Sequence, residues 1–322
     1  MLAIYVHDLS PDLFAIFGVK LHWYGLAYVA GFYLCYLVMH SLAKRGLSQI
    51  KPESVADLIT GTALFGVVLG GRLGYMLLYN FNEFIHNPLL FFRINDGGMA
   101  SHGGILGVAL YLLWYARRHK ISWIGIGDTI VCGAPLGLLT GRIANFINGE
   151  LFGRVTTHPW AMKFPTEIQH QDFQQRYLAD HGQPFPLDPA LQHSQEIIAY
   201  YSKEFGSYDN FVALLYPRHP SQLYEAAGEG LFLTIVLYTL RVNFPRMPRG
   251  ILTGLFFLLY ALVRIALENV REPDSGAAMV LGLTKGQFFS TFMIAIGLAF
   301  ILYGVLRGPE ALPQKEKAPA SS

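Results

Sequence analysis

Long apolar stretches dominate the chain, and short polar segments separate them. Crossing the hydrocarbon core of a bilayer takes roughly 20 apolar residues in a helix. Seven stretches reach about that length, and they cover residues 22–42, 55–79, 98–117, 122–146, 221–241, 250–270 and 286–306. The pattern predicts an all-α polytopic membrane protein with about seven transmembrane helices.

The composition agrees with lipid as the main solvent. Of the 322 residues, 52% are hydrophobic and 14% are charged, whereas a soluble domain has roughly 25% charged residues. The net charge of +2 is small and the basic residues are scattered, so we expect no nucleic-acid partner. Cys35 and Cys132 lie in apolar stretches without disulfide or metal-ligand spacing, and we interpret both as buried apolar side chains.

The distribution of basic residues predicts the orientation in the membrane, because cytoplasmic loops retain Lys and Arg. Basic residues follow the first, third, fifth and last stretches: Lys44, Arg45, Lys51, Arg117, Arg118, Lys120, Arg241, Arg246, Arg249, Arg307, Lys315 and Lys317. The opposite loops carry mainly acidic residues: Glu83, Asp96, Glu272 and Asp274. We therefore expect the N-terminus outside and the C-terminus in the cytoplasm.

We expect residues 1–310 to form one seven-helix transmembrane domain. Within it, residues 147–220 are rich in His, Gln, Asp and Pro, and the alternation of loops places this insertion on the outer side as a small extracytoplasmic subdomain. The last residues, 311–322, lack apolar periodicity and are rich in Pro, Ala and Ser, which predicts a disordered cytoplasmic tail.

Several polar side chains lie inside the predicted spans or at their outer ends. An Arg at the centre of a spanning helix costs about 2.5–3.5 kcal/mol on insertion scales, so such residues mark functional candidates. The set comprises Tyr24, Arg72, His102, Arg142, Asn145, Arg264 and, at the start of the fifth stretch, Arg218, His219, Gln222, Tyr224 and Glu225. Because consecutive helices run in opposite directions, all of these residues fall just beneath the outer headgroups.

The sixth stretch carries a polar stripe. Tyr260, Arg264, Glu268 and Arg271 are spaced by four, four and three residues, which places them on one face of a helix. Tyr260 and Arg264 favour a functional role. For Glu268, an internal salt-bridge ladder with Arg264 or Arg271 that only orients the helix is an equal alternative.

Two other residues leave alternatives open. His102 opens a His-Gly-Gly run near a predicted helix start, where backbone N–H groups favour an anion, although it could also be a satisfied interfacial histidine. Arg72 could act in catalysis or could extend outward to lipid phosphates.

Glycines recur every four residues in the second and fourth stretches, at Gly66, Gly70, Gly74, Gly133, Gly137 and Gly141. Such small faces let helix backbones touch, and we interpret them as scaffold.

Several arginines beside a histidine and amide or hydroxyl donors suit recognition of a phosphate, which phospholipid headgroups supply. The chain has no GxSxG elbow, HExxH helix or Asp-rich metal loop, so hydrolysis at a serine or metal centre has no support. The residues alone lead to chemistry on anionic lipids.

The polar block GRIANFINGELFGR, from Gly141 to Arg154, resembles the signature of the bacterial prolipoprotein diacylglyceryl transferase family. Three further segments resemble that family in the same order: HWYG at 22–25, SHGGILG at 101–107 and RHPSQLYE at 218–225. So does the stretch from Tyr260 to Asp274, which ends in REPD. The chain departs from the family pattern at Ala144 and Phe152, where Gly and Trp are frequent, and in a longer segment after Arg154.

The resemblance implies transfer of a diacylglyceryl group from phosphatidylglycerol to the thiol of the lipobox cysteine of preprolipoproteins, with release of glycerol phosphate. His102 would be the base, and Arg142 and Arg264 would stabilise the departing phosphate. The residues expected to bind substrate are Tyr24, Asn145, Glu150, Gly153, Tyr260, Arg154 and Glu268, with Asn148 as a further candidate. An essential Arg that lowers the thiol pKa is the alternative to a His102 base.

The expected partners are phosphatidylglycerol, the signal sequence of preprolipoproteins and other membrane lipids, in the bacterial cytoplasmic (inner) membrane. No metal or organic cofactor is expected. An anion or lipid transporter is the alternative function, but the charges cluster beneath one leaflet and no internal repeat is evident. A noncatalytic scaffold would leave the polar stripe without a role.

Overall fold

The computed structural model describes residues 4–16, 19–93, 97–272 and 282–309. The predicted tail at 311–322, as well as Asp96 and Asp274, lies outside the described residues. The chain divides into two compact units. Unit 1 comprises residues 1–31, 135–235 and 256–298, and unit 2 comprises residues 32–134, 236–255 and 299–322.

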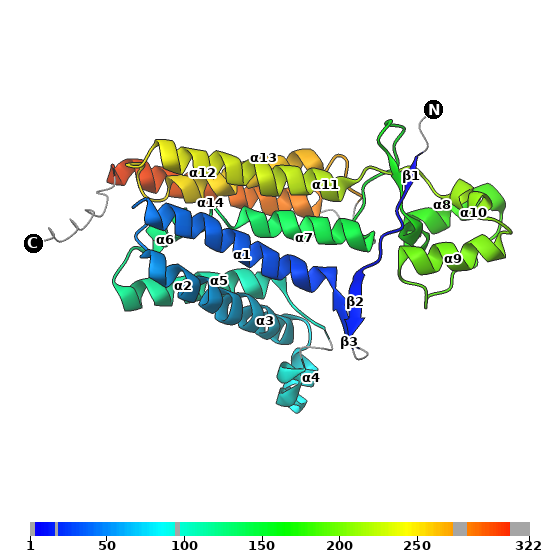
Figure 1. Cartoon of the computed structure of the whole chain (residues 1–322), viewed down its shortest axis with the longest axis horizontal. Helices are drawn as coiled ribbons and strands as arrows, with labels where there is room; N and C mark the ends of the chain where they lie inside the picture. The colour runs from blue at the N-terminus through cyan, green and yellow to red at the C-terminus, as the bar shows by residue number, and fades with distance from the viewer. Residues whose placement is uncertain (1–3, 17–18, 94–96, 273–281, 310–322) are drawn as a thin grey trace, which may run out of the picture. The chain divides into compact units, whose positions relative to one another are not determined.

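Helices form most of the described chain, and all seven predicted stretches are helical (Figure 1). Two of the helical segments are continuous through a π-helical stretch. The first runs from α2 (Val55–Gly61) through η2 (Thr62–Leu69) into α3 (Gly70–Leu78), and the second from α11 (Ser221–Glu225) through η6 (Ala226–Phe232) into α12 (Leu233–Asn243). The other helices in the predicted stretches are α1 (Trp23–Lys44), α5 (Ser101–His119), α6 (Trp123–Ile130), α7 (Pro135–Asn148), α13 (Ile251–Leu267) and α14 (Lys285–Arg307). Shorter elements are η1 (Pro52–Ser54), α4 (Phe81–His86), η3 (Pro88–Phe92), η5 (Pro165–Gln169), α8 (Gln171–His181), α9 (Ser194–Glu204) and α10 (Tyr208–Leu214).

Among the described residues, four helices are long and apolar enough to cross a membrane: 23–44, 52–78, 221–243 and 286–307. A fifth candidate arises if α6 and α7 form one span. The predicted fourth stretch was continuous, but the helix breaks between Ile130 and Pro135. Proline has no N–H for the helical ladder and favours the first position of a new helix, so α7 begins there.

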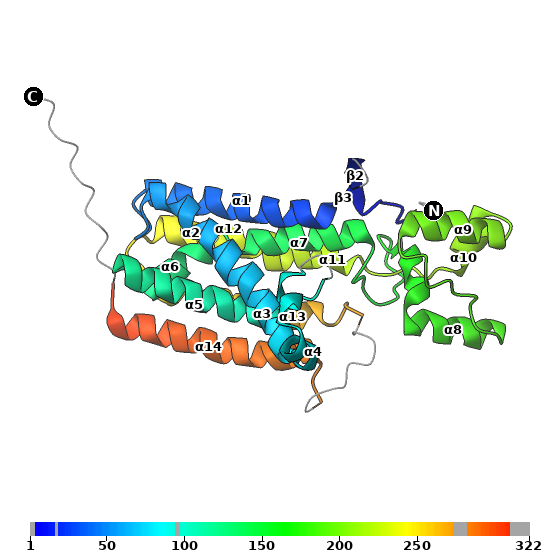
Figure 2. The same cartoon turned by 90° about the horizontal axis from the view of Figure 1, so that it is seen from below.

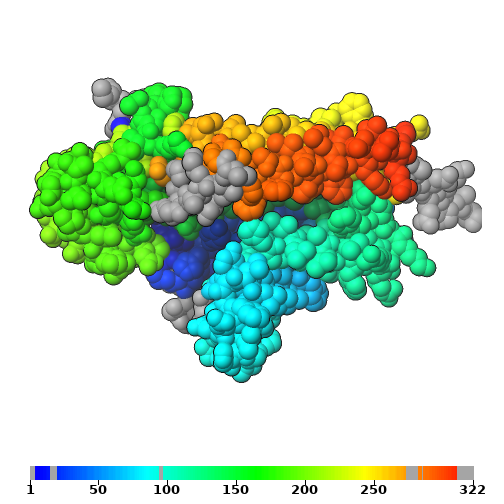
Figure 3. Space-filling view, turned by 180° about the vertical axis from the view of Figure 1, so that it is seen from behind, coloured from blue at the N-terminus to red at the C-terminus, as the bar shows by residue number. Residues whose placement is uncertain are grey.

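The outer face of α14 is apolar and uncovered (Figure 3). Its exposed side chains include Phe289, Phe292, Ile296 and Leu302. Large exposed apolar side chains along a whole helix are typical of a surface that faces lipid. The described helices are therefore those of a membrane protein.

In unit 2, glycines let two helical segments touch. A Cβ at Gly70 would lie 2.9 Å from the Cα of Gly107, and one at Gly74 would lie 2.5 Å from the Cα of Gly103. Figure 2 shows α3 crossing α5 closely. The scaffold role predicted for the second-stretch glycines is confirmed.

The fourth-stretch glycines differ from the prediction in part. Gly133 packs on Cys35, whose Sγ would lie 3.0 Å from an added Cβ. By contrast, an added Cβ at Gly137 or Gly141 meets nothing within 4 Å. Gly137 still allows a close backbone approach, because a Cβ added at Gly31 of α1 would lie 2.9 Å from the Gly137 Cα. The packing role predicted for these glycines therefore holds at Gly133 and Gly137, whereas Gly141 shows no such constraint on its own Cβ position.

In unit 1, residues after α7 form a subdomain of short helices around an aromatic core. Figure 1 shows α8, α9 and α10 gathered together. Their core consists of Ile168, Phe173, Tyr177, Phe185, Ile197, Tyr201, Phe211 and Leu215. The N-terminal strand β1 (Tyr5–Val6) pairs in parallel with β4 (Met162–Lys163), and β2 (Asp12–Ile16) pairs antiparallel with β3 (Val19–His22).

Candidate functional site

Arg142 on α7 is held by two carboxylates from a neighbouring helix of unit 1. Its Nη1 lies 2.8 Å from Glu225 Oε2, and its Nη2 donates to Glu229 Oε2 at 3.2 Å. Both carboxylate side chains are fully buried. Burying a carboxylate in an apolar helix requires a partner, so this pairing fixes the guanidinium plane of Arg142.

Two further arginines complete the cluster. Arg264 on α13 places its Nη1 3.6 Å from both Glu225 Oε2 and Glu229 Oε1, and its Nη2 is 3.6 Å from Glu268 Oε2. Arg271 Nη1 lies 3.4 Å from Glu225 Oε2. We call Arg142, Arg264, Arg271, Glu225, Glu229 and Glu268 the charged cluster.

The predicted stripe on the sixth helix is shorter than expected. Helix α13 ends at Leu267, so Tyr260 and Arg264 lie on it while Glu268 and Arg271 follow in turns. The ladder alternative for Glu268 is confirmed in part, because Glu268 pairs with Arg264. Tyr260 lies one helical turn before Arg264 on α13, on the helix face that carries Arg264.

The charged cluster retains hydrogen-bonding capacity. Glu225 Oε1, Glu229 Oε1, Glu268 Oε2 and Arg264 Nη1 are buried, and none of them has a hydrogen-bond partner among the described residues. Arg264 Nη1 is within ion-pair range of two carboxylates but too far to donate to them. The site therefore offers a cationic donor beside carboxylate acceptors, a set that suits a ligand with both phosphate and hydroxyl groups.

A chain of amide hydrogen bonds extends from α7 to the loop after it. Asn145 Nδ2 donates to Glu150 Oε1 at 2.8 Å and lies 3.4 Å from the hydroxyl of Tyr24. Asn148 Nδ2 reaches the same Glu150 oxygen at 3.4 Å, and Gln222 Nε2 donates to the Glu150 carbonyl at 2.6 Å. The structure thus brings together Tyr24, Asn145 and Glu150, three of the residues predicted to bind substrate.

Gly153 lies where backbones converge. Its N–H donates to the His219 carbonyl at 2.8 Å, and an added Cβ would lie 2.3 Å from the Val270 carbonyl oxygen. Only glycine fits this approach. Arg154 is exposed, and its Nε donates to the Arg271 carbonyl at 2.9 Å. It therefore links this loop to the segment that follows α13.

His102 and Arg72 belong to unit 2. His102 is exposed in the first turn of α5, and its part in the site stays a prediction. Arg72 is 3% exposed, and its guanidinium donates to the carbonyls of Leu90, Phe91, Arg93, Gly97 and Gly98. These bonds hold residues 90–93 and 97–98 and turn the guanidinium toward the protein rather than toward lipid phosphates, and a catalytic role for Arg72 stays a prediction.

Arg218 is the centre of a second ion-pair network, in the subdomain of short helices. Its fully buried guanidinium bonds Glu167, Asp172 at 2.9 Å and Glu272 at 3.3 Å. Burial raises the pKa of Glu167 to about 7, against the opposing effect of Arg218. Arg218 therefore joins η5, α8 and the segment after α13 through buried ion pairs, apart from the charged cluster.

The sequence interpretation missed Glu229, and it noted Glu225 and Arg271 without assigning either a role in catalysis or substrate binding. Two acidic residues four apart inside an apolar helix, Glu225 and Glu229, are expensive in lipid, and that spacing could have revealed them. They flank the start of the π-helical η6, a type of irregularity frequent at functional sites. Among the described residues, no group of three or more His, Cys, Asp or Glu side chains could hold a metal ion.

Comparison with known proteins decides the family. The sequence profile described as "Prolipoprotein diacylglyceryl transferase" matches residues 11–303. The chain belongs to the prolipoprotein diacylglyceryl transferase family. It is 39% identical over 313 residues, 97% of each chain, to the phosphatidylglycerol–prolipoprotein diacylglyceryl transferase of Stenotrophomonas maltophilia. It is 39% identical over 312 residues to the enzyme of the same name from Xylella fastidiosa, which covers 96% of this chain and 97% of the relative. It is 38% identical over 304 residues to the enzyme of that name from Serratia proteamaculans, which covers 94% of this chain and 95% of the relative.

Within this family, the two departures noted in the polar block are both buried. Ala144 is 1% exposed, and so is Phe152. Phe152 stacks on Phe164 with ring centroids 5.2 Å apart, and the Arg218 guanidinium lies 5.0 Å from its ring centroid. Both residues are therefore buried packing positions within the prolipoprotein diacylglyceryl transferase motif, and neither belongs to the charged cluster.

Proposed function

We propose that this protein transfers the diacylglyceryl group of phosphatidylglycerol to the thiol of the lipobox cysteine of preprolipoproteins. The sulfur forms a bond to the glyceryl carbon, and the bond between that carbon and the phosphate oxygen breaks. Glycerol phosphate leaves with the electron pair, the cysteine becomes a thioether, and the thiol proton passes to a base.

The charged cluster carries this proposal. Arg264 Nη1, buried and without a hydrogen bond, is placed to donate to the departing phosphate as its charge develops. Arg142 would act beside it, oriented by Glu225 and Glu229. Glu225 Oε1 and Glu229 Oε1 accept no hydrogen bond from a described residue. They suit the hydroxyl groups of a glycerol headgroup, which an ethanolamine or choline headgroup lacks.

The substrate supplies the nucleophile, and an ordinary thiol of pKa about 8.5 needs help to ionise at neutral pH. We assign His102 as the base. The alternative is that an essential arginine lowers the thiol pKa. Near-normal turnover in His102→Gln, together with abolished turnover in Arg142→Ala, would overturn the His102 assignment.

Substrate binding is assigned to the residues around the charged cluster. Tyr24, Asn145 and Glu150 form one hydrogen-bonded chain, and Tyr260 lies one turn before Arg264. We add Gly153, Arg154 and Glu268, which lie at the convergence of the 153–154 loop and the end of α13. These residues would orient the headgroup and the signal sequence.

The proposal includes seven spans in the bacterial inner membrane, with the N-terminus periplasmic and the C-terminus cytoplasmic. The alternation of basic loops supports this orientation. It places residues 147–220 in the periplasm, and substrates would reach the site laterally from the bilayer. Cysteines introduced in the 147–220 segment and tested with a membrane-impermeant thiol reagent on intact cells would check it.

The relatives' printed names support transfer rather than transport. The test is the release of glycerol phosphate from phosphatidylglycerol by the purified protein, measured with and without a lipobox peptide. Release in a one-to-one ratio with modified peptide is expected. Passage of anions or lipids across proteoliposomes, without peptide-dependent release of glycerol phosphate, would favour the transporter.

A further inference from the structure

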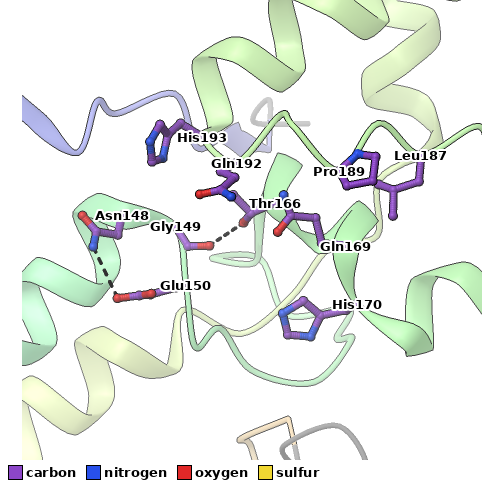
Figure 4. A pocket seen from close by; sticks show the side chains of 10 residues that line it. All are labelled: Asn148, Gly149, Glu150, Thr166, Gln169, His170, Leu187, Pro189, Gln192 and His193. Carbon is purple, nitrogen blue, oxygen red and sulfur yellow. Dashed lines mark hydrogen bonds between the residues drawn. The ribbon is translucent and has the colours of Figure 1, made fainter. Parts of the chain in front are cut away.

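A polar pocket opens between the loop after α7 and the subdomain of short helices, wholly within unit 1. Its volume is about 440 Å³. Figure 4 shows Asn148 and Glu150 on one side, with Thr166, Gln169 and Gln192 facing them. The remaining lining residues are Gly149, His170, Leu187, Pro189 and His193.

The lining chemistry favours a neutral ligand rich in amides. Asn148, Gln169 and Gln192 each carry both a donor and an acceptor, the combination that a peptide backbone presents. No Lys or Arg lines the pocket, and Glu150 contributes a carboxylate, which opposes binding of a phosphate. Asn148 Oδ1 is buried without a hydrogen-bond partner among the described residues, and Asn148 Nδ2 lies 3.4 Å from Glu150 Oε1.

Hydrogen bonds and close packing hold the wall of the pocket around Gly149 in place. Gly149 has a φ of +70°, which glycine adopts without strain, and its carbonyl accepts a hydrogen bond from Thr166 Oγ1. Behind it lies His7, fully buried and bonded through Nδ1 to Ser194 Oγ at 2.8 Å. A Cβ on Gly149 would lie 3.0 Å from both His7 and Ser194, so packing fixes this wall.

The same wall is continuous with the proposed active site. Glu150 lines the pocket, and its carboxylate accepts from Asn145 at 2.8 Å. Asn145 lies one turn after Arg142 on α7. An acceptor cysteine at the charged cluster would therefore leave the following residues of its chain directed toward the pocket.

We infer that this pocket binds the residues that follow the acceptor cysteine in the preprolipoprotein, as an extended peptide whose main chain bonds the amide side chains. The inference rests on the proposed function, which brings a protein substrate to the site. A modified protein must continue from the membrane into the aqueous phase immediately after its cysteine. A pocket lined by amide side chains accommodates varied sequences, because main-chain groups are common to all of them.

The test compares two synthetic lipobox peptides, one ending directly after the cysteine and one continuing for six polar residues. The variant is Gln192→Leu, since Gln192 is exposed and its substitution leaves the core intact. Gln175→Leu on α8 is the matched control, exposed but outside the pocket lining. Full-length protein in phosphatidylglycerol nanodiscs is used throughout.

Gln192→Leu should raise the KM for the long peptide about three- to ten-fold, the effect of one or two lost hydrogen bonds. The KM for the short peptide and for phosphatidylglycerol should stay unchanged, as should all values in Gln175→Leu. A raised KM for phosphatidylglycerol would show instead that the pocket holds the lipid headgroup. An equal change in the KM of both peptides, or no change in either, would also overturn the inference. Failure of the wild-type protein to modify either peptide would overturn the proposed function itself.

Discussion

Arg142 Nη1 lies 2.8 Å from Glu225 Oε2, and the Glu225 side chain is fully buried. The same oxygen lies 3.6 Å from Arg264 Nη1 and 3.4 Å from Arg271 Nη1. One carboxylate thus sets the positions of three guanidinium groups from three segments of the chain. We regard this arrangement as the basis of phosphate recognition.

Glu225→Gln should therefore reduce turnover, although this carboxylate does not contact the departing phosphate. The substitution keeps the side-chain shape but removes the charge that orients the arginines, so we expect kcat to fall about 10- to 100-fold, less than the roughly 10²- to 10³-fold loss typical of removing a direct donor. Steady-state kinetics with Glu204→Gln, an exposed position on α9, provides the control. Unchanged kcat in a folded Glu225→Gln protein would show that the arginines need no such positioning.

Gly153→Ala should be severely damaging for steric reasons. The added methyl would lie 2.3 Å from the Val270 carbonyl oxygen and 2.8 Å from His219 Cβ, and backbone atoms on two sides prevent relief. We expect a lower melting temperature and loss of activity. Gly137→Ala, where the methyl meets nothing within 4 Å, should be neutral or stabilising by up to about 1 kcal/mol; normal activity in Gly153→Ala would contradict the packing described.

Arg72→Gln tests the structural role of a residue that could have been catalytic. Losing its bonds to five carbonyls in residues 90–93 and 97–98 should destabilise unit 2 by roughly 3 kcal/mol or more, because hydrogen bonds to a charged group are worth about 1.5–3 kcal/mol each. Thermal unfolding in detergent measures the effect, and Arg93→Gln, which keeps its backbone carbonyl, is the control. A stable Arg72→Gln protein without activity would instead indicate a catalytic role.

The pH dependence of stability should report on Glu167. Its pKa rises from an ordinary 4.5 to about 7 because it is buried, so the folded protein holds this proton more tightly than the unfolded chain. The resulting stabilisation is full below pH 4.5 and is lost as the pH rises through 7. Glu167→Gln imitates the protonated form, so its melting temperature should match wild type at pH 5 and exceed it at pH 8. The same difference at both pH values would rule out this titration.

Much of the fold could be predicted from hydrophobic periodicity. All seven apolar stretches are helical, because a lipid environment requires every backbone group to be paired within the segment. The break before Pro135 and the end of α13 at Leu267 were missed, since apolar composition continues across both points. Proline geometry explains the first, and the second lies where the chain turns to place Glu268 and Arg271 in the cluster.

The site could be predicted only in part, for a physical reason. Arg142 and Arg264 stand out because isolated charges in apolar helices are costly, but periodicity does not show which carboxylate pairs with which arginine. The contact of His7 with Gly149 likewise joins residues far apart in sequence. Such tertiary contacts depend on how the helices pack. The resemblance to a known family supplied the reaction and its substrates, which the residues alone did not indicate.

The most direct test of the central claim is mass spectrometry of a synthetic lipobox peptide incubated with the purified protein and phosphatidylglycerol. Parallel reactions use a Cys→Ser peptide, an Arg142→Ala protein and an Arg176→Ala protein, the last changing an exposed arginine outside the charged cluster. We predict a diacylglyceryl mass increment on the cysteine peptide with wild type and Arg176→Ala, and none with the serine peptide or Arg142→Ala. An unmodified cysteine peptide with folded, lipid-bound wild-type protein, or full modification by Arg142→Ala, would contradict the account.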